Sequence, residues 1–286
     1  AGGKPVIVNC SKENSFKLNA QLLESAITKK TKWLILNSPN NPTGAVYSKS
    51  ELENIISVLL NNKNVNVVTD DIYEHIIYDV PFYTIAQLVK DDHLKTRIFT
   101  VNGLSKSYAM TGWRIGYIAG SAEVVKAMAT IQSQSTTNPN SIAQAASVEA
   151  LLLSNKKVLD ERANIFKKRR DLLIHNLSDI PGISFNLPQG AFYLFVSAND
   201  LIGKKIQEGL KKDDRIAVDI KRVPSLSAPV VVPEVERLPE IIHSENTIIH
   251  PFGLINLCLY LYLIFAIYPR LIKKKLSLLT HSIFYI

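Results

Sequence analysis

Short, continuous apolar segments alternate with amphipathic ones along most of the chain, and this alternation constrains the fold more than any other feature. Runs rich in β-branched residues predict strands at Val6–Val8, Trp33–Leu36, Val65–Thr69, Arg97–Val101 and Ile115–Ala119. Their unbroken hydrophobicity is typical of strands that are buried on both faces of a parallel sheet. Trp113, just before the last of these strands, is expected to pack inside the core.

Segments with apolar residues at helical spacing separate or follow these strands. They predict helices over Asn19–Lys29, Ser50–Leu60, Ala122–Ser133, Ile142–Leu153 and Leu159–Leu177. In the second helix, Ser50 followed by Glu53 predicts a capping box. Ile183–Phe185 and Phe192–Val196 are expected to form a closing strand pair. The order of elements predicts an α/β fold with a mainly parallel sheet between helices.

The composition excludes several classes of protein. The chain has 286 residues, of which 47% are hydrophobic, so it is neither disordered nor fibrous. A formal net charge of +8 is spread along the sequence, which predicts no nucleic-acid partner but is compatible with binding phosphates. Cys10 and Cys258 form neither a disulfide framework nor a metal motif, and Cys10 is expected to be a small buried residue. We therefore expect a cytoplasmic protein with no metal and no signal peptide.

Polar motifs follow three of the predicted strands. They span Asn37–Gly44, Asp70–His75 and Asn102–Lys106. In parallel sheets, ligands bind beyond the carboxyl ends of the strands. Three unrelated turns would account for these motifs, and so would convergence on one site.

The motif that contains Lys106 has the clearest chemical potential. Most lysines lie on the surface, but an amine held just after a strand and a glycine turn can bond covalently to a carbonyl carbon. Arg114 follows closely and can donate two hydrogen bonds to a phosphate, and Ser105 or Ser107 can add another.

The other two motifs supply complementary groups. Asp70 can pair with a cationic ring nitrogen, and Tyr73 and Asn41 can both hydrogen-bond a phenolate oxygen. A carbonyl-reactive lysine, an acid for a ring nitrogen, donors for a phenolate and an arginine for a phosphate together describe a site for pyridoxal 5'-phosphate.

The same motifs resemble a known family. Asn-Asn-Pro-Thr-Gly at 40–44, Asp-Asp-Ile-Tyr-Glu-His at 70–75, Ser-Lys at 105–106, Gly-Trp-Arg-Ile-Gly-Tyr at 112–117 and Pro-Gln-Gly-Ala-Phe-Tyr at 188–193 occur in the order seen in class I/II aminotransferases of fold type I. The likeness is greatest to the bacterial aspartate, or aspartate/prephenate, aminotransferases, and it covers residues 1 to about 198.

The resemblance implies roles for particular residues. Lys106 would hold the cofactor covalently and then carry the α-proton, with Tyr73 as the second catalytic residue. The implied cofactor-binding residues are Lys106, Asn41, Asp70, Tyr73, Arg114 and Ser105. The implied reaction moves an amino group between aspartate and a 2-oxo acid, either 2-oxoglutarate or a prephenate-like acceptor. Family members are homodimers, so a homodimer is implied as well.

The sequence also departs from the family. The family has a sizeable portion before the point that matches Ala1, and its small domain ends with an arginine that clamps the substrate carboxylate, which has no counterpart here after residue 200. The resemblance therefore implies an N-terminally truncated large domain at 1–140, a partial small domain at 141–198 and a divergent tail at 199–286. One alternative is a non-catalytic remnant of such an enzyme. Another is a membrane-associated protein, because the uncharged segment Phe252–Tyr268 approaches the length of a short membrane span.

Overall fold

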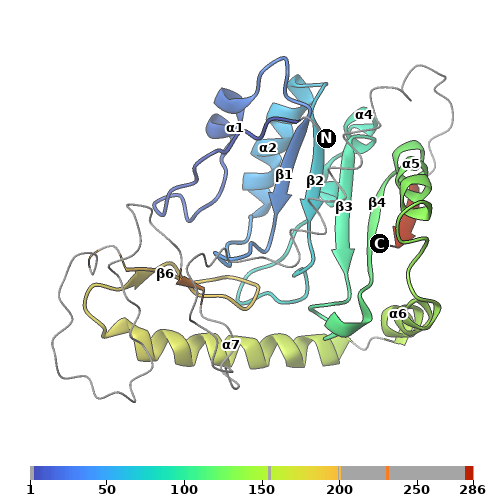
Figure 1. The fold of residues 1–286 in the computed structure, drawn as a ribbon. Helices are drawn as coiled ribbons and strands as arrows, with labels where there is room; N and C mark the ends of the chain where they lie inside the picture. Colours follow the sequence, from blue (N-terminus) through green and yellow to red (C-terminus); the bar gives the residue numbers. More distant parts are fainter. Residues whose placement is uncertain (1–2, 154–155, 199, 201–229, 232–280, 286) are drawn as a thin grey trace, which may run out of the picture.

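The larger of the two sheets in the part of the chain that the structure describes is mixed and has five strands (Figure 1). A computed structural model describes residues 3–153, 156–198, 200, 230–231 and 281–285. The strand order is β1-β2-β3-β4-β8, with β1 (Trp33–Asn37), β2 (Asn66–Asp70), β3 (Ile98–Gly103), β4 (Gly116–Ser121) and β8 (His281–Tyr285). Strands β1 to β3 are parallel, whereas β4 runs antiparallel to β3 and β8 antiparallel to β4. The α/β prediction is confirmed, and the sheet contains an antiparallel edge in addition to its parallel strands.

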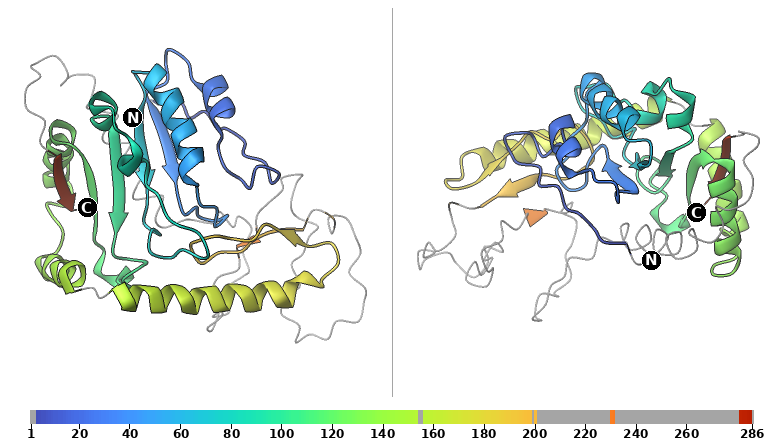
Figure 2. Two further views of the ribbon diagram at one scale, coloured as in Figure 1. Left: turned by 180° about the vertical axis from the view of Figure 1, so that it is seen from behind. Right: turned by 90° about the horizontal axis from the view of Figure 1, so that it is seen from above.

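The five helices that helical periodicity predicts are present, with changes of at most three residues at their ends. The helices are α1 (Ala20–Ala26), α2 (Lys49–Asn61), α3 (Ile85–Leu88), α4 (Asp92–Lys95), the 3-10 turn η1 (Thr111–Trp113), α5 (Ala122–Ser133), α6 (Ser141–Leu153) and α7 (Lys156–Ser178). Of these, α3, α4 and η1 were not predicted. Seen from behind, α2 covers β1 and β2, and α7 runs across the end of the sheet toward which β1 and β3 point (Figure 2).

The capping box of α2 lies two residues earlier than predicted. The Ser48 hydroxyl accepts a hydrogen bond from the backbone N–H of Glu51 at 3.3 Å, and the Glu51 carboxylate accepts one from the Ser48 N–H at 2.7 Å. The prediction of Ser50 and Glu53 is wrong because the backbone is still extended at Ser48 and helical from Lys49, which puts Ser50 inside the first turn. The two candidate pairs have the same spacing, so only the backbone conformation distinguishes them.

The main hydrophobic core lies between α2 and the sheet. Leu52, Ile55 and Leu59 of α2 are almost completely buried, together with Val67 of β2. Arg97 closes this core at the C-terminal end of α2. Its guanidinium donates to the carbonyl oxygens of Leu59 at 3.2 Å, of Asn62 at 3.2 Å and of Val65. Carbonyls in the last turn of a helix lack the regular helical donors, so the arginine adds a donor to Leu59 and to the C-cap residue Asn62, whose carbonyls also accept from the Asn62 and Val65 N–H groups.

Two expectations about apolar residues are wrong. The segment Val6–Val8 forms no strand, and Val6 and Ile7 are 72% and 84% exposed. Hydrophobicity favours a strand only where a neighbouring strand is available, and β1 pairs with β2 rather than with this segment. Trp113 lies in η1 and is 44% exposed, so it is not a core residue. Cys10 is half-buried against the main core, and burial raises the pKa of its thiol.

A second, smaller sheet follows the long helix α7. Its order is β5-β6-β7, with β5 (Ser184–Phe185), β6 (Phe195–Ser197) and β7 (Val230–Val231), and both pairings are antiparallel. This confirms the predicted closing strand pair. The domain limits near residues 140 and 198 stay predictions. The apolar segment Phe252–Tyr268 lies outside the described residues, and among those that are described no helix is both long and apolar enough to cross a membrane.

Candidate active site

The polar motifs that follow β1, β2 and β3 meet at one edge of the sheet. The parallel register aligns Asn37 with Asp70 and Asp70 with Val101, so the segments after these residues leave the sheet side by side. The Asn37 amide connects the first two motifs, because its nitrogen donates to the Asp70 carbonyl at 2.9 Å and its oxygen accepts from the Asn41 N–H at 2.8 Å. The three motifs therefore lie at the same edge of the sheet, and that they form one functional site stays a prediction.

Lys106 lies just beyond β3, and its side chain is half-buried. Its Nζ lies 5.8 Å from the centre of the Phe192 ring. Burial lowers the pKa of this amine, the Arg114 guanidinium lowers it further, and the Asp70 carboxylate opposes both effects. A lowered pKa increases the fraction of neutral amine at neutral pH, and the neutral amine is the nucleophilic form.

Asp70 is the last residue of β2 and the negative group of this site. Its Oδ1 accepts a hydrogen bond from the Ile72 N–H at 3.3 Å. Burial raises the pKa of Asp70, while that hydrogen bond and the nearby charge of Lys106 hold it down. A carboxylate in such a position is stabilised by a cationic neighbour.

Tyr73 and Asn41 come together at a shared neighbour, Tyr193, and their shared role on a ligand stays a prediction. Tyr73 is 3% exposed. Its hydroxyl oxygen lies 2.7 Å from that of Tyr193, and the Asn41 amide nitrogen donates to the Tyr193 hydroxyl at 3.2 Å. Burial is the main cause that raises the pKa of Tyr73, and the neighbouring Tyr193 raises it further.

Tyr193 was not among the predicted site residues. The signal that could have found it is the motif at 188–193, which was used for the resemblance only. Gly44 holds this motif at the site, because its carbonyl oxygen accepts from the N–H groups of Gln189 at 2.8 Å and Gly190 at 3.0 Å. On the other side, Ala191 N–H donates to Ile76 O at 2.9 Å. The segment is thus fastened between the loops that carry Asn41 and Tyr73.

Gly190 is required by this close approach. A Cβ atom at this position would lie 2.8 Å from the Cβ of Pro39 and 2.9 Å from the Ile76 carbonyl oxygen. Both contacts are shorter than normal van der Waals separations, so a side chain would push the segment away from the two loops.

Arg114 and Ser105 are near the site but are less constrained. Arg114 has a left-handed backbone conformation with φ 51°, its side chain is exposed, and Nη1 donates to Thr111 O at 3.1 Å. It is close enough to Lys106 for its charge to affect the lysine pKa. Ser105 is half-buried beside Lys106. Their roles as phosphate ligands stay predictions.

A second acidic residue, Asp71, is directed into the protein. It is 2% exposed, and its Oδ1 accepts a hydrogen bond from the Thr69 hydroxyl at 2.6 Å. Burial raises its pKa to about 7 despite that hydrogen bond, and the charges of Glu74 and Asp70 add to the rise. The sequence assigns Asp71 no role, because two adjacent aspartates do not reveal which one faces the core.

The side chains at this edge fit pyridoxal phosphate. The site brings together an amine with a lowered pKa, a buried carboxylate, a hydroxyl–amide cluster and a guanidinium. These are a nucleophile for the cofactor's carbonyl, an acceptor for its protonated ring nitrogen, and donors for its phenolate and phosphate. Among the described residues, no group of three His, Cys, Asp or Glu side chains is placed to hold a metal ion.

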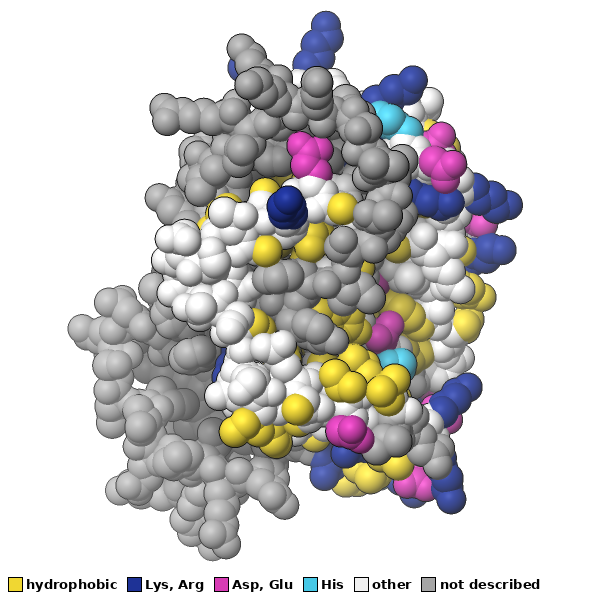
Figure 3. All heavy atoms as spheres, turned by 90° about the vertical axis from the view of Figure 1, so that its right-hand side faces the viewer, with side chains coloured by type: hydrophobic (Ala, Val, Ile, Leu, Met, Phe, Trp, Pro, Cys, Tyr) yellow, Lys and Arg dark blue, Asp and Glu magenta, His cyan; other side chains and the backbone are white. Residues whose placement is uncertain are grey.

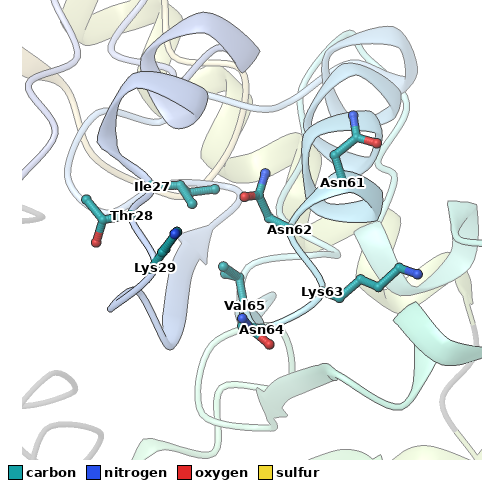
Figure 4. Close-up of a pocket in the computed structure, with 8 residues that line it drawn as sticks. All are labelled: Ile27, Thr28, Lys29, Asn61, Asn62, Lys63, Asn64 and Val65. Carbon is teal, nitrogen blue, oxygen red and sulfur yellow. The ribbon is translucent and has the colours of Figure 1, made fainter.

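A separate cavity of about 400 Å³ lies elsewhere in the molecule (Figure 4). It is lined by Ile27, Thr28, Lys29, Asn61, Asn62, Lys63, Asn64 and Val65. These residues precede β1 and β2, so the cavity lies at the amino ends of the strands. It contains none of the predicted site residues and is distinct from the edge that carries Lys106.

The fold and this edge together define an α/β protein with a lysine-centred site suited to a phosphorylated carbonyl cofactor. Comparison with known proteins gives the family. The model of the aminotransferase class I and II family matches residues 1–228. The match extends beyond residue 198, where the resemblance was predicted to end. The chain belongs to this family.

Named relatives and solved structures agree with this assignment. A probable aspartate/prephenate aminotransferase of Rickettsia prowazekii is 54% identical over 208 residues, which cover 72% of this chain and 51% of the relative. An aspartate aminotransferase of Rhizobium meliloti is 49% identical over 208 residues, with coverages of 72% and 50%. The crystal structure of an aspartate aminotransferase from Rhizobium meliloti superposes with a TM-score of 0.68 at 48% identity and covers 72% of this chain and 51% of that one. The chain therefore spans about half the length of the relatives it matches.

Proposed function

We propose that this chain carries the pyridoxal-phosphate site of an aminotransferase that moves an amino group between aspartate and a 2-oxo acid. The observation that carries the proposal is the half-buried Lys106 amine, whose pKa responds to both Asp70 and Arg114, beside the Tyr73–Tyr193–Asn41 cluster. The choice of aspartate, and of 2-oxoglutarate or prephenate as acceptor, is supported by the names of the relatives.

Lys106 has two tasks in this proposal. When bound, pyridoxal phosphate supplies a ring that accepts electrons from the substrate α-carbon. The neutral Lys106 amine would hold the cofactor through its carbonyl carbon, with loss of water, and after displacement by the substrate amine it would accept the proton of the α-carbon. Its lowered pKa serves both tasks, because a general base works best when its pKa lies near the working pH.

The other side chains orient the cofactor and tune its charges. Asp70 pairs with the protonated ring nitrogen. The positive charge of that nitrogen would lower the pKa of the Asp70 carboxyl, which burial raises. Tyr73 and Asn41 donate to the phenolate oxygen. Arg114 offers a planar pair of N–H donors to the phosphate, with Ser105 as an additional donor. A cofactor held in this way would present the α-hydrogen of the substrate to Lys106.

The direct test is borohydride trapping of the cofactor on the protein. The wild-type chain is mixed with pyridoxal phosphate, its visible absorbance is recorded, borohydride is added, and the labelled lysine is identified by mass spectrometry. We expect labelling of Lys106 in the wild type and none at that position in Lys106→Ala. Lys126→Ala, which removes an exposed lysine of α5, is the matched control and should label as the wild type does.

The outcomes of this test separate the proposal from its alternative. Labelling of Lys106, followed by formation of the amino form of the cofactor when aspartate is added, supports the aminotransferase. Labelling without any change on addition of aspartate identifies a non-catalytic remnant that still binds the cofactor. Equal labelling of wild type and Lys106→Ala, or none in either, refutes the site.

We further propose a cytoplasmic homodimer that acts on amino acids and 2-oxo acids. Large apolar side chains on and near α6 are exposed in the single chain, among them Ile142 at 68% and Leu152 at 77%. Figure 3 views the side that carries α5 and α6, where apolar side chains lie between polar ones. Their cover by a second copy would remove them from water. Light scattering that reports a monomer over the micromolar range would refute the dimer.

A further inference from the structure

Tyr193 is the common neighbour of two groups that the proposed function uses. Its hydroxyl oxygen lies 2.7 Å from the Tyr73 hydroxyl and accepts from the Asn41 amide at 3.2 Å. Resting on the proposed function, we infer that Tyr193 is a positioning residue, which directs the hydroxyl proton of Tyr73 and the amide of Asn41 toward the phenolate oxygen of the cofactor.

A count of protons gives the direction of these hydrogen bonds. A tyrosine hydroxyl has one proton to donate and can accept two hydrogen bonds. Tyr193 accepts from Asn41, so it keeps its own proton for Tyr73. An anionic oxygen is a stronger acceptor than a neutral hydroxyl, so with the phenolate in place the Tyr73 proton turns to the phenolate. Tyr193 then donates to Tyr73, and each hydrogen bond in the chain polarises and strengthens the next.

The backbone around Tyr193 is rigid enough for this task. Gln189 and Gly190 donate to Gly44 O, and the N–H of Tyr78 donates to Gln189 O at 2.7 Å. The Tyr193 ring packs beside that of Phe192 with centroids 4.8 Å apart, and edge-on to the ring of Tyr73 at 5.9 Å. Because these ring contacts do not involve the hydroxyl, Tyr193→Phe removes the hydrogen bonds and preserves the packing.

The spectroscopic test uses the full-length chain loaded with pyridoxal phosphate. Hydrogen-bond donors to the phenolate stabilise its negative charge. This matters most when the Lys106 nitrogen has lost its proton, because no neighbouring cation then balances the phenolate. Such donors therefore favour the deprotonated state of the Lys106 nitrogen. Weaker donors should therefore raise the pH midpoint of the visible absorbance change. For the loss of one hydrogen bond we expect the midpoint in Tyr193→Phe to rise by about 0.3 to 1 pH unit.

Two further proteins make the test specific. Tyr78→Phe removes a neighbouring buried hydroxyl that donates to the Ala191 carbonyl, and it should leave the midpoint unchanged. Replacement of Tyr193 by 3-fluorotyrosine keeps the hydroxyl and makes it a stronger donor, so the midpoint should fall. This replacement also supplies the measurement if Tyr193→Phe does not fold.

Each outcome decides between the proposals. A rise in Tyr193→Phe together with a fall in the fluorotyrosine protein supports the positioning role. An unchanged midpoint in either, or an equal rise in Tyr78→Phe, overturns it while the proposed function stands. If the wild-type chain forms no borohydride-trapped link at Lys106, the proposed function fails, and the role of Tyr193 fails with it.

Discussion

Asp71 makes the stability of the protein depend on pH in a way that can be worked out from its environment. Its carboxyl is 2% exposed, and Oδ1 accepts from Thr69 at 2.6 Å. Burial disfavours the charged form and outweighs the stabilising effect of the Thr69 and Thr84 hydroxyls, and this raises the pKa from 3.8 to about 7. In the unfolded chain the same carboxyl titrates near 4.

The sign and the size of the effect follow from this difference. Below about pH 4 the carboxyl is protonated in both states and contributes nothing. Between about pH 4 and 7 the unfolded chain loses the proton while the folded chain keeps it, so the free energy of unfolding falls. Above about pH 7 the loss is complete, and it amounts to about 4 kcal/mol, taking about 1.4 kcal/mol for each tenfold difference in proton affinity.

The perturbation that isolates this effect is Asp71→Asn. The amide keeps an oxygen for the Thr69 hydroxyl and carries no charge at any pH in this range. We expect the unfolding free energy of the variant, minus that of the wild type, to increase by about 2 to 4 kcal/mol between pH 4.5 and pH 8. Denaturant titrations followed by circular dichroism at several pH values measure this difference.

A matched control variant measures the general effect on stability of replacing an acidic side chain by an amide. Asp92 in α4 has an 87% exposed side chain, and Asp92→Asn should give a difference that is flat across the same pH range. If the Asp71→Asn difference is flat as well, or decreases with pH, the carboxyl is not held protonated in the folded protein. The reasoning from burial would then be wrong.

Three further predictions follow from particular contacts. Ser48→Ala should lower the free energy of unfolding by about 1 kcal/mol in denaturant titrations, because it removes the cap of α2. Ser50→Ala should lower it by less than half as much, and equal losses would contradict the observed capping box. Gly190→Ala should destabilise by about 1 to 3 kcal/mol, measured in the same way, and weaken pyridoxal phosphate binding in a spectroscopic titration, because the added methyl would lie 2.9 Å from a backbone oxygen. Asp70→Asn should lower the pKa of Lys106 further, because it removes the charge that favours the ammonium; NMR titration of the isotopically methylated lysine measures this, and a rise would contradict it.

Much of the site could be predicted because its residues follow strands. Asn41, Asp70 and Lys106 each lie in a polar motif just after an apolar run, and the register of parallel strands brings such motifs to one edge. The five longer helices were predictable for a similar reason, since α5 has the predicted limits and the other four differ by a few residues at their ends, whereas the four-residue helices α3 and α4 were not predicted. In both cases the information is local, and the periodicity of the side chains expresses it.

Other features depend on the conformation and the contacts that the chain adopts in the folded protein. Val6 and Ile7 are as apolar as a strand requires, but no strand in the described part of the chain pairs with them. Trp113 is 44% exposed although its large apolar ring favours burial. Ser48 rather than Ser50 caps α2, because the backbone is still extended at Ser48. Single-sequence patterns contain none of this information.

The sequence by itself determined the alternation of strands and helices, the edge of the sheet where the polar motifs meet, and the types of side chain gathered there. Only the tertiary structure decided that Tyr193, 120 residues beyond Tyr73, shares a hydrogen bond with it, and that Asp71 faces the core while Asp70 faces Lys106. The physical reason is that backbone periodicity is local. Burial, pKa and hydrogen-bond partners are instead set by whichever segments pack together, and here Gly44 and Gly190 allow the close approach that creates the site.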